Sequence, residues 1–224
     1  MKKSVSLKLI IFSFLLAAGS VAYSAPEFQA GSGSNSTVAG VNNEASEANS
    51  SAVGFNNTAT GVNSSAIGYQ NETSGVISSA FGFQNKASGK NSSAFGTVNT
   101  ASGINSSTVG TVNTASGKNS SAFGSQYKVT GEASGAFGVG KVTINASGKE
   151  YKYINKGNNS YMIGNYNKIA SGSNNNFILG NNVSIGSGIN NSVGLGNGST
   201  VSSSNEVSVG SATLKRKITN VADG

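Results

Sequence analysis

Residues 92–105 read SSAFGTVNTASGIN, and residues 106–119 repeat them almost letter for letter as SSTVGTVNTASGKN. The glycine that ends each Ser-rich apolar segment returns every fourteen residues, at Gly40, Gly54, Gly68, Gly82, Gly96, Gly110, Gly124 and Gly138. A fixed short period is typical of a solenoid, in which each unit forms one coil and stacks on its neighbours. A disordered Gly/Ser/Asn linker has no reason to keep such a register. The repeat therefore predicts an all-β solenoid with one coil per fourteen residues.

Each unit must contain two short strands and two turns. In the first strand, Ser93 and Phe95 share one face and Ala94 faces the other, because strand side chains alternate. We expect the large residue of each unit to form a buried apolar ladder: Val53, Ile67, Phe81, Phe95, Val109, Phe123 and Phe137. The second strand should add a ladder of small residues: Ala59, Ala87, Ala101, Ala115 and Ala133.

An asparagine recurs once per unit, at Asn57, Asn71, Asn85, Asn99 and Asn113. We expect these side chains at turns, because asparagine tolerates left-handed backbone geometry and can bond its own backbone. The glycines at the corners supply the positive φ angles of sharp turns.

So narrow a coil buries little apolar surface. At about 25 cal/mol per Å² of apolar area, that burial hardly offsets roughly 1.5 kcal/mol of ordering entropy per residue. Packing against identical coils would bury a second face of each unit. The energetics alone therefore predict an oligomer.

The period breaks after Gly138. The next matching glycine, Gly164, lies 26 residues on, and the following steps are 16, 16 and 14 residues. The excess falls within residues 139–156, whose segment KEYKYI at 149–154 suggests a protruding hairpin. Loops on rigid scaffolds often bind ligands, so the candidate ligand contacts are Lys149, Tyr151, Lys152 and Tyr153. A purely structural insertion with exposed tyrosines is the alternative.

The first residues are typical of a secretory signal peptide. Lys2 and Lys3 precede an apolar run from Leu9 to Ala18, and small residues follow. We expect cleavage after Ser24 and export of the mature chain. Removal of residues 1–24 takes three lysines from the formal charge of +7, leaving 12 basic against 8 acidic groups, or +4. The remaining lysines are scattered, which argues against nucleic-acid binding.

The composition offers little for catalysis. The chain contains no cysteine and no histidine, and its one aspartate is Asp223. Seven glutamates do not pair in a way consistent with the repeat. Carboxylate pairs and metal clusters are therefore not expected, and the sequence predicts no enzyme, no catalytic residue, no cofactor and no metal.

The segment at 204–224 ends in LKRKITNVADG and strongly resembles the neck motif of trimeric autotransporter adhesins of the Yersinia-adhesin type. The residues that carry this resemblance are Arg216, Ile218, Asn220 and Val221. The fourteen-residue units are similar to that family's head repeats; NSSAIG at 63–68 differs in having Ser65 where an apolar residue is common, so a smaller or more polar interior is expected. The expected domains are a signal peptide at 1–24, a head at 25–203 with its insertion near 139–156, and a neck at 204–224.

The resemblance implies a left-handed parallel β-roll, assembled as a homotrimer on the surface of a Gram-negative outer membrane. It implies an adhesin head that binds host extracellular matrix or cell-surface proteins, collagen-like ones among them, or other bacteria, through multivalent contacts. No heptad stalk or strand-rich anchor follows Gly224, so we expect outer-membrane attachment to depend on a segment missing here.

Two functions of another class stay open: a structural spacer solenoid and an ice-binding repeat protein. An ice-binding face needs threonines in one register on every coil. Thr58, Thr60, Thr100 and Thr114 are not expected to share one register, which argues against ice binding.

Overall fold

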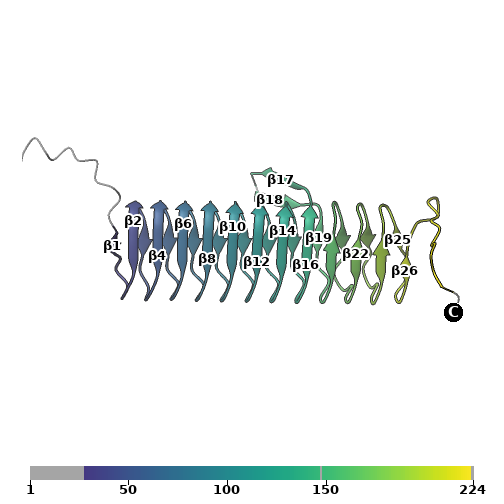
Figure 1. Ribbon diagram of the computed structural model, residues 1–224, viewed down its shortest axis with the longest axis horizontal. Helices are drawn as coiled ribbons and strands as arrows, with labels where there is room; N and C mark the ends of the chain where they lie inside the picture. The colour runs from purple at the N-terminus through teal and green to yellow at the C-terminus, as the bar shows by residue number, and fades with distance from the viewer. Residues whose placement is uncertain (1–27, 147, 223–224) are drawn as a thin grey trace, which may run out of the picture.

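The computed structural model describes residues 28–146 and 148–222. The predicted signal peptide at 1–24 lies outside these residues. The described chain winds into a long, straight rod of stacked coils built from strands and turns, with no helix (Figure 1). This arrangement confirms the predicted all-β solenoid.

Two long sheets form opposite sides of the rod, and a small hairpin stands apart from them. The first sheet contains, in spatial order, β1 (Gln29–Ala30), β2 (Thr37–Val41), β4 (Ser51–Phe55), β6 (Ser65–Tyr69), β8 (Ser79–Phe83), β10 (Ser93–Thr97), β12 (Ser107–Thr111), β14 (Ser121–Ser125), β16 (Gly135–Val139), β20 (Tyr161–Ile163), β22 (Phe177–Leu179), β24 (Val193–Leu195) and β26 (Val207–Ser208). The second contains β25 (Thr200–Val201), β23 (Ser184–Ile185), β21 (Lys168–Ile169), β19 (Ile154–Asn155), β15 (Lys128–Val129), β13 (Thr114–Ala115), β11 (Thr100–Ala101), β9 (Lys86–Ala87), β7 (Glu72–Thr73), β5 (Thr58–Ala59) and β3 (Glu44–Ala45). The hairpin consists of β17 (Val142–Asn145) and β18 (Gly148–Tyr151).

Neighbouring coils pair in parallel and in strict register. Phe95 in β10 lies between Phe81 of β8 and Val109 of β12, each fourteen residues away. After the insertion the steps lengthen: Met162 pairs with Ile178, sixteen residues on. Among the described residues, only β1 and the β17–β18 hairpin pair antiparallel. The predicted period, including its break, is thus confirmed.

The interior of the regular coils is lined by alanine rather than by the large residues. Ala94 is fully buried, whereas Phe95 is 38% exposed. The predicted alternation is confirmed, but the prediction that the Val53 to Phe137 ladder is buried is wrong. Two strands of one coil approach so closely that only small side chains fit between them, so the large residue of each unit points outward. Ser65 lies on this outer face beside Ile67, so it is not the residue that shapes the interior. The interior is nonetheless small, as expected, because alanine lines it.

The second-strand ladder follows the prediction for four of its five members. Ala59, Ala87, Ala101 and Ala115 are fully buried. Ala133 is half-buried at a turn with φ of 48°. Val129 occupies the ladder position that was predicted for Ala133, because it pairs directly with Ala115. From here onward the interior widens and accepts larger side chains: Tyr127, Val129, Met162, Ile169, Ile178, Val183 and Ile185.

The recurring asparagines are buried inside the coils, which corrects the prediction that they take the left-handed turn position. The Asn99 amide donates to the carbonyls of Phe95 and Gly110 at 2.8 and 2.7 Å. Its backbone N–H donates to Asn85 Oδ1 of the preceding coil at 3.0 Å. The left-handed position belongs instead to the preceding residue, such as Val98 with φ of 58°. The asparagines therefore form a continuous polar ladder that satisfies backbone groups facing the interior.

Glycine is required where coils approach most closely. Gly96 has φ of +115°, and a Cβ at this position would overlap the carbonyl oxygen of Gly110 in the next coil. Both the backbone angle and the stacking therefore favour glycine at this corner.

The threonines of the second sheet correct a further expectation. Thr58, Thr100 and Thr114 do share one register, but Glu72 and Lys86 stand between Thr58 and Thr100 in that column. These two residues form an ion pair at 2.6 Å. Charged groups therefore interrupt the flat threonine array that ice binding requires.

Candidate ligand-binding surfaces

The insertion forms an antiparallel hairpin at the side of the rod. Val142 pairs with Tyr151 and Asn145 with Gly148. The solenoid continues without a gap, because β19 pairs with β15 directly across the insertion. The predicted hairpin is confirmed, although its strands, β17 and β18, begin earlier than the segment 149–154 that suggested it. Figure 1 shows it rising above the coils of β12 to β16.

The hairpin folds back over earlier coils and is bonded to two of them. The Tyr151 hydroxyl donates to the carbonyl of Val112 at 3.0 Å and lies 2.9 Å from the Thr114 hydroxyl. The Lys149 ammonium donates to the carbonyl of Val98 at 2.9 Å. Burial raises the pKa of Tyr151 above its usual value. Two of the predicted ligand contacts thus hold the hairpin on the rod.

The other two predicted contacts lie at the base of the hairpin. The Lys152 ammonium is 5.7 Å from the centre of the Tyr153 ring, and this ring lies 5.4 Å from that of Tyr166, tilted by 53°. With neighbouring coils they line a cavity of about 310 Å³, here called the tyrosine groove. Its lining residues are Lys152, Tyr153, Tyr166, Lys168, Asn182, Val183 and Ser184. The groove combines aromatic rings with two ammonium groups. Sequence reasoning missed Tyr166, Lys168 and Asn182, which only coil stacking brings to the insertion.

Tyr127 occupies the interior at the start of the wider coils. Its hydroxyl donates to the Gly164 carbonyl at 2.9 Å and accepts from the Asn167 N–H at 3.0 Å. Burial raises the pKa of Tyr127 to about 12, and the nearby Tyr153 and Tyr166 add to the effect, while the Asn167 bond opposes it.

This pKa shift predicts a pH-dependent loss of stability. Because the folded pKa is raised above the unfolded value of about 10, the stabilisation is complete below pH 10 and is lost as pH rises to about 12. The loss amounts to about 3 kcal/mol. Urea unfolding of the wild type and of Tyr127→Phe, followed over this range, should show the smaller loss in the variant. Parallel curves for the two proteins would contradict the assignment.

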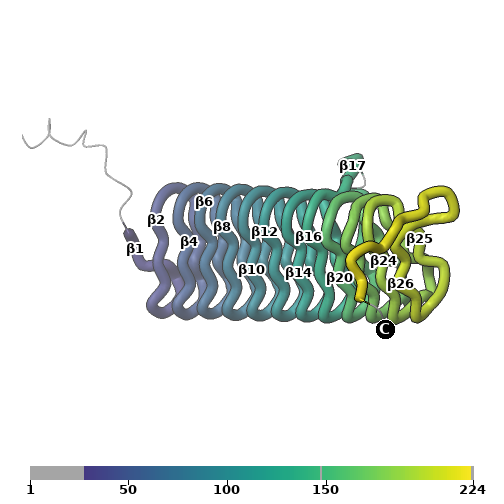
Figure 2. The backbone as a smooth tube through the Cα atoms, turned by 45° about the vertical axis from the view of Figure 1, so that its right-hand side comes forward, coloured from purple at the N-terminus to yellow at the C-terminus, as the bar shows by residue number. Residues whose placement is uncertain are grey.

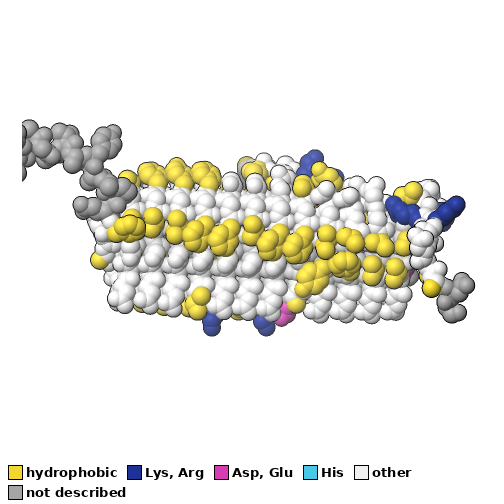
Figure 3. Space-filling model, in the orientation of Figure 1, with side chains coloured by type: hydrophobic (Ala, Val, Ile, Leu, Met, Phe, Trp, Pro, Cys, Tyr) yellow, Lys and Arg dark blue, Asp and Glu magenta, His cyan; other side chains and the backbone are white. Residues whose placement is uncertain are grey.

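A hydrophobic band follows the outer face of the first sheet along the rod (Figure 3). Its members occupy one register, and we call them the outer ladder: Val53, Ile67, Phe81, Phe95, Val109, Phe123, Phe137, Ile163, Leu179 and Leu195. The Phe81 and Phe95 rings stack with their centres 5.1 Å apart, and Phe123 and Phe137 stack at 5.0 Å. A shorter stack of Phe55, Tyr69 and Phe83 lies on the same face at the ends of their strands. The outer ladder forms a continuous apolar stripe along the rod.

The predicted neck residues lie at the C-terminal end of the rod. The Arg216 guanidinium donates to the carbonyls of Val209 and Asn197 and, at 3.0 Å, to the Ser199 hydroxyl. It thereby folds the terminal segment back over the last coils (Figure 2). Ile218 and Val221 are well exposed, and Asn220 has φ of 60°. The neck assignment stays a prediction.

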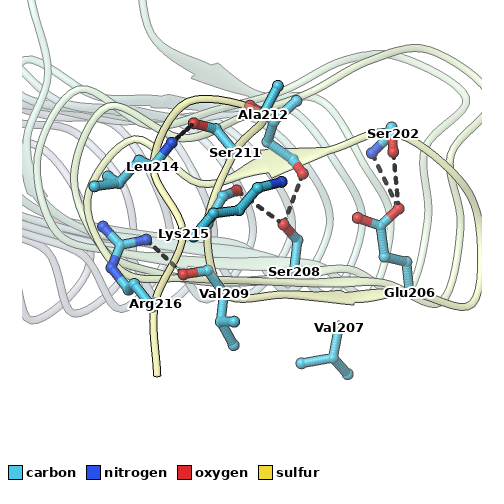
Figure 4. A pocket seen from close by; sticks show the side chains of 12 residues that line it. Ser202, Glu206, Val207, Ser208, Val209, Ser211, Ala212, Leu214, Lys215 and Arg216 are labelled. Atoms are coloured by element: carbon cyan, nitrogen blue, oxygen red, sulfur yellow. Dashed lines mark hydrogen bonds between the residues drawn. The ribbon is translucent and has the colours of Figure 1, made fainter. Parts of the chain in front are cut away.

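A second hollow of about 510 Å³ lies beside this segment (Figure 4). One Glu206 carboxylate oxygen accepts hydrogen bonds from Ser202 and Ser203, and the side-chain bond from Ser203 is the main cause that lowers the Glu206 pKa. This carboxylate oxygen is therefore engaged in hydrogen bonds within its own chain.

In the described residues no group of three or more His, Cys, Asp or Glu side chains is placed to hold a metal ion. No helix found within residues 28–146 and 148–222 has the length and apolar character to cross a membrane.

These features define a parallel β-solenoid with a repeated outer surface, and the comparisons give its type. The family model for the YadA head domain repeat matches residues 32–57, 59–76, 74–99 and 101–126. The chain thus carries head repeats of the YadA type over these residues. This match confirms the resemblance of the repeats and supports an adhesin head.

Among solved structures, the crystal structure of the collagen-binding domain of the Yersinia adhesin YadA aligns at 20% identity with a TM-score of 0.34. The alignment covers 76% of this chain and 76% of that chain. No curated protein sequence matches the chain.

Proposed function

We propose that this head attaches a bacterium to host extracellular matrix, to host cells or to neighbouring bacteria through many weak contacts along its length. The observation that carries the proposal is the strict register of the coils, which repeats equivalent surface groups on the second sheet as well as the first. Repetition raises avidity without any single strong site, because each contact increases the effective concentration of the next. Matrix proteins, collagen among them, are the first ligands to assay.

We further propose that three copies assemble side by side on the outer ladder. Phe95, Phe137, Ile163 and Leu195 each leave more than a third of their surface exposed in the single chain. Monomeric proteins rarely expose apolar stripes of this extent. Covering the stripe with identical copies would supply the burial that a narrow alanine-lined coil lacks. The family to which the head repeats belong supports three as the number of copies.

Export and display follow the same proposal. An adhesin head acts outside the cell, which agrees with the signal peptide predicted at 1–24 and with placement on a Gram-negative surface. A structural spacer would need only the rod and no binding surface. It is therefore the conclusion to draw if the head binds no matrix protein, cell or bacterium.

One pair of variants tests assembly and adhesion together. Replacing Phe95 and Phe123 by aspartate places charge in the outer ladder, so we expect sedimentation of monomers and at least a hundredfold weaker retention on immobilised matrix protein. The matched control replaces Val76 and Ile104 by aspartate, because both are exposed apolar residues outside the ladder. It should still sediment as a trimer and be retained on matrix protein.

Two results would refute the proposal. A wild-type head that sediments as a folded monomer at micromolar concentration would remove the trimer. A wild-type trimer that is retained on no matrix protein, cell or bacterium would leave the spacer role.

A further inference from the structure

The tyrosine groove brings two lysines without an ion pair into one cavity. Within the regular coils, Lys86 pairs with Glu72 and Lys118 with Glu132. Across the described residues, Lys152 and Lys168 have no ion pair, although Lys152 faces the Tyr153 ring. Between residues 127 and 168 the chain has six lysines and two glutamates, and one of these glutamates, Glu132, is already paired. The groove is therefore suited to an anionic ligand.

The remaining lining groups point to the kind of anion. Tyr153 packs against the core and is half-buried, while Tyr166 is 40% exposed, so their tilted rings form a fixed apolar wall. Asn182 and Ser184 add amide and hydroxyl groups to the same cavity. Flat apolar surface beside hydrogen-bonding groups fits a sugar ring, and ammonium groups fit its acidic substituent. A volume of about 310 Å³ is at the lower end for small-ligand sites.

We propose that the tyrosine groove binds an acidic saccharide, with Lys152 and Lys168 contacting its sulfate or carboxylate and Tyr153 and Tyr166 packing on its ring. This inference rests on the proposed adhesive function and names the ligand class at one site of the head. Tyr151 and Lys149 serve it as positioning residues, because their bonds to two earlier coils fix the hairpin that ends in Lys152. The site occurs once per chain, unlike the repeated outer face.

The experiment measures binding of the full chain to defined probes. The probes are a heparin-derived oligosaccharide for sulfate, sialyllactose for carboxylate, lactose as the neutral sugar and polyglutamate as the acidic peptide. The wild type should bind at least one acidic saccharide and should bind lactose and polyglutamate at least tenfold more weakly. The double variant Lys152→Gln with Lys168→Gln should lose at least tenfold in affinity for that saccharide.

A matched control has the same change in charge. Lys90→Gln with Lys118→Gln removes two exposed lysines from the regular coils and should leave saccharide affinity within about twofold. Tyr153→Leu tests the ring wall and should weaken the saccharide at least fivefold. Circular dichroism melting confirms that each variant folds.

Three results would overturn the inference: no binding of either acidic saccharide by the wild type, equal losses in the groove and control variants, or polyglutamate binding as tight as that of the saccharides. Retention on matrix protein, measured in parallel, separates the two proposals. A head that is retained on matrix but ignores acidic saccharides refutes the groove alone. A head that binds saccharide in the groove but is retained on no surface refutes only the adhesive role.

Discussion

Replacing Asn99 by aspartate is expected to lower the free energy of unfolding by at least about 4 kcal/mol. The Asn99 amide donates to the carbonyls of Phe95 and Gly110, and both bonds lie in the interior. A carboxylate oxygen in that place has no hydrogen to donate and faces two carbonyl oxygens. The variant thus buries a negative charge and leaves two acceptors unsatisfied. Urea unfolding monitored by circular dichroism measures the loss.

Asn91→Asp is the matched control, since Asn91 lies one turn earlier in the same coil on the surface. Its amide bonds the exposed Asn105 side chain at 3.0 Å. We expect a change within about 0.5 kcal/mol, as for ordinary surface substitutions. Similar losses for both variants would show that the asparagine ladder does not support the coils.

Replacing Gly96 by alanine is expected to be comparably severe, at about 4 kcal/mol or more. The Cβ would overlap the Gly110 carbonyl of the next coil, and φ is +115°. Since the coils are held in register on both sides, neither neighbour can withdraw without breaking strand pairs. The unfolding midpoint in urea reports the effect.

Gly188→Ala separates the two causes. Gly188 has φ of +79° with no atom within 4 Å of its added Cβ, so only the backbone angle is strained, at about 1–2 kcal/mol. If Gly96→Ala costs no more than this control, coil stacking is looser than described.

The sequence predicted the strands, their period and the site of the insertion, because all three follow from spacing alone. It did not predict which face of each strand points inward. Alternation distinguishes Ala94 from Phe95 but is symmetric between inside and outside, and the usual preference for burying the larger residue gave the wrong answer. The width of the coil decides, and that width depends on how closely two strands of one coil pack.

The asparagine ladder shows the same limit. A residue tolerant of left-handed geometry suggested a turn, yet the turn position holds Val98 and the asparagine lies inside. The available signal was the strict recurrence of one polar residue type from Asn57 to Asn113 while its predecessor varies among Asn, Gln and Val. For the groove, the sequence supplied Lys152 and Tyr153, whereas Lys168 and Tyr166 reach it only through the stacking of the following coil.

The uniform register also has a genetic consequence. Because residues 92–105 and 106–119 are nearly identical and pair with their neighbours in the same way, replication slippage between their coding sequences would add or remove one whole coil in frame. Asparagine, alanine and glycine would meet equivalent partners on either side of the new junction. Each such event would change the length of the rod by about 4.8 Å, so the rod could lengthen or shorten stepwise without a disruptive intermediate.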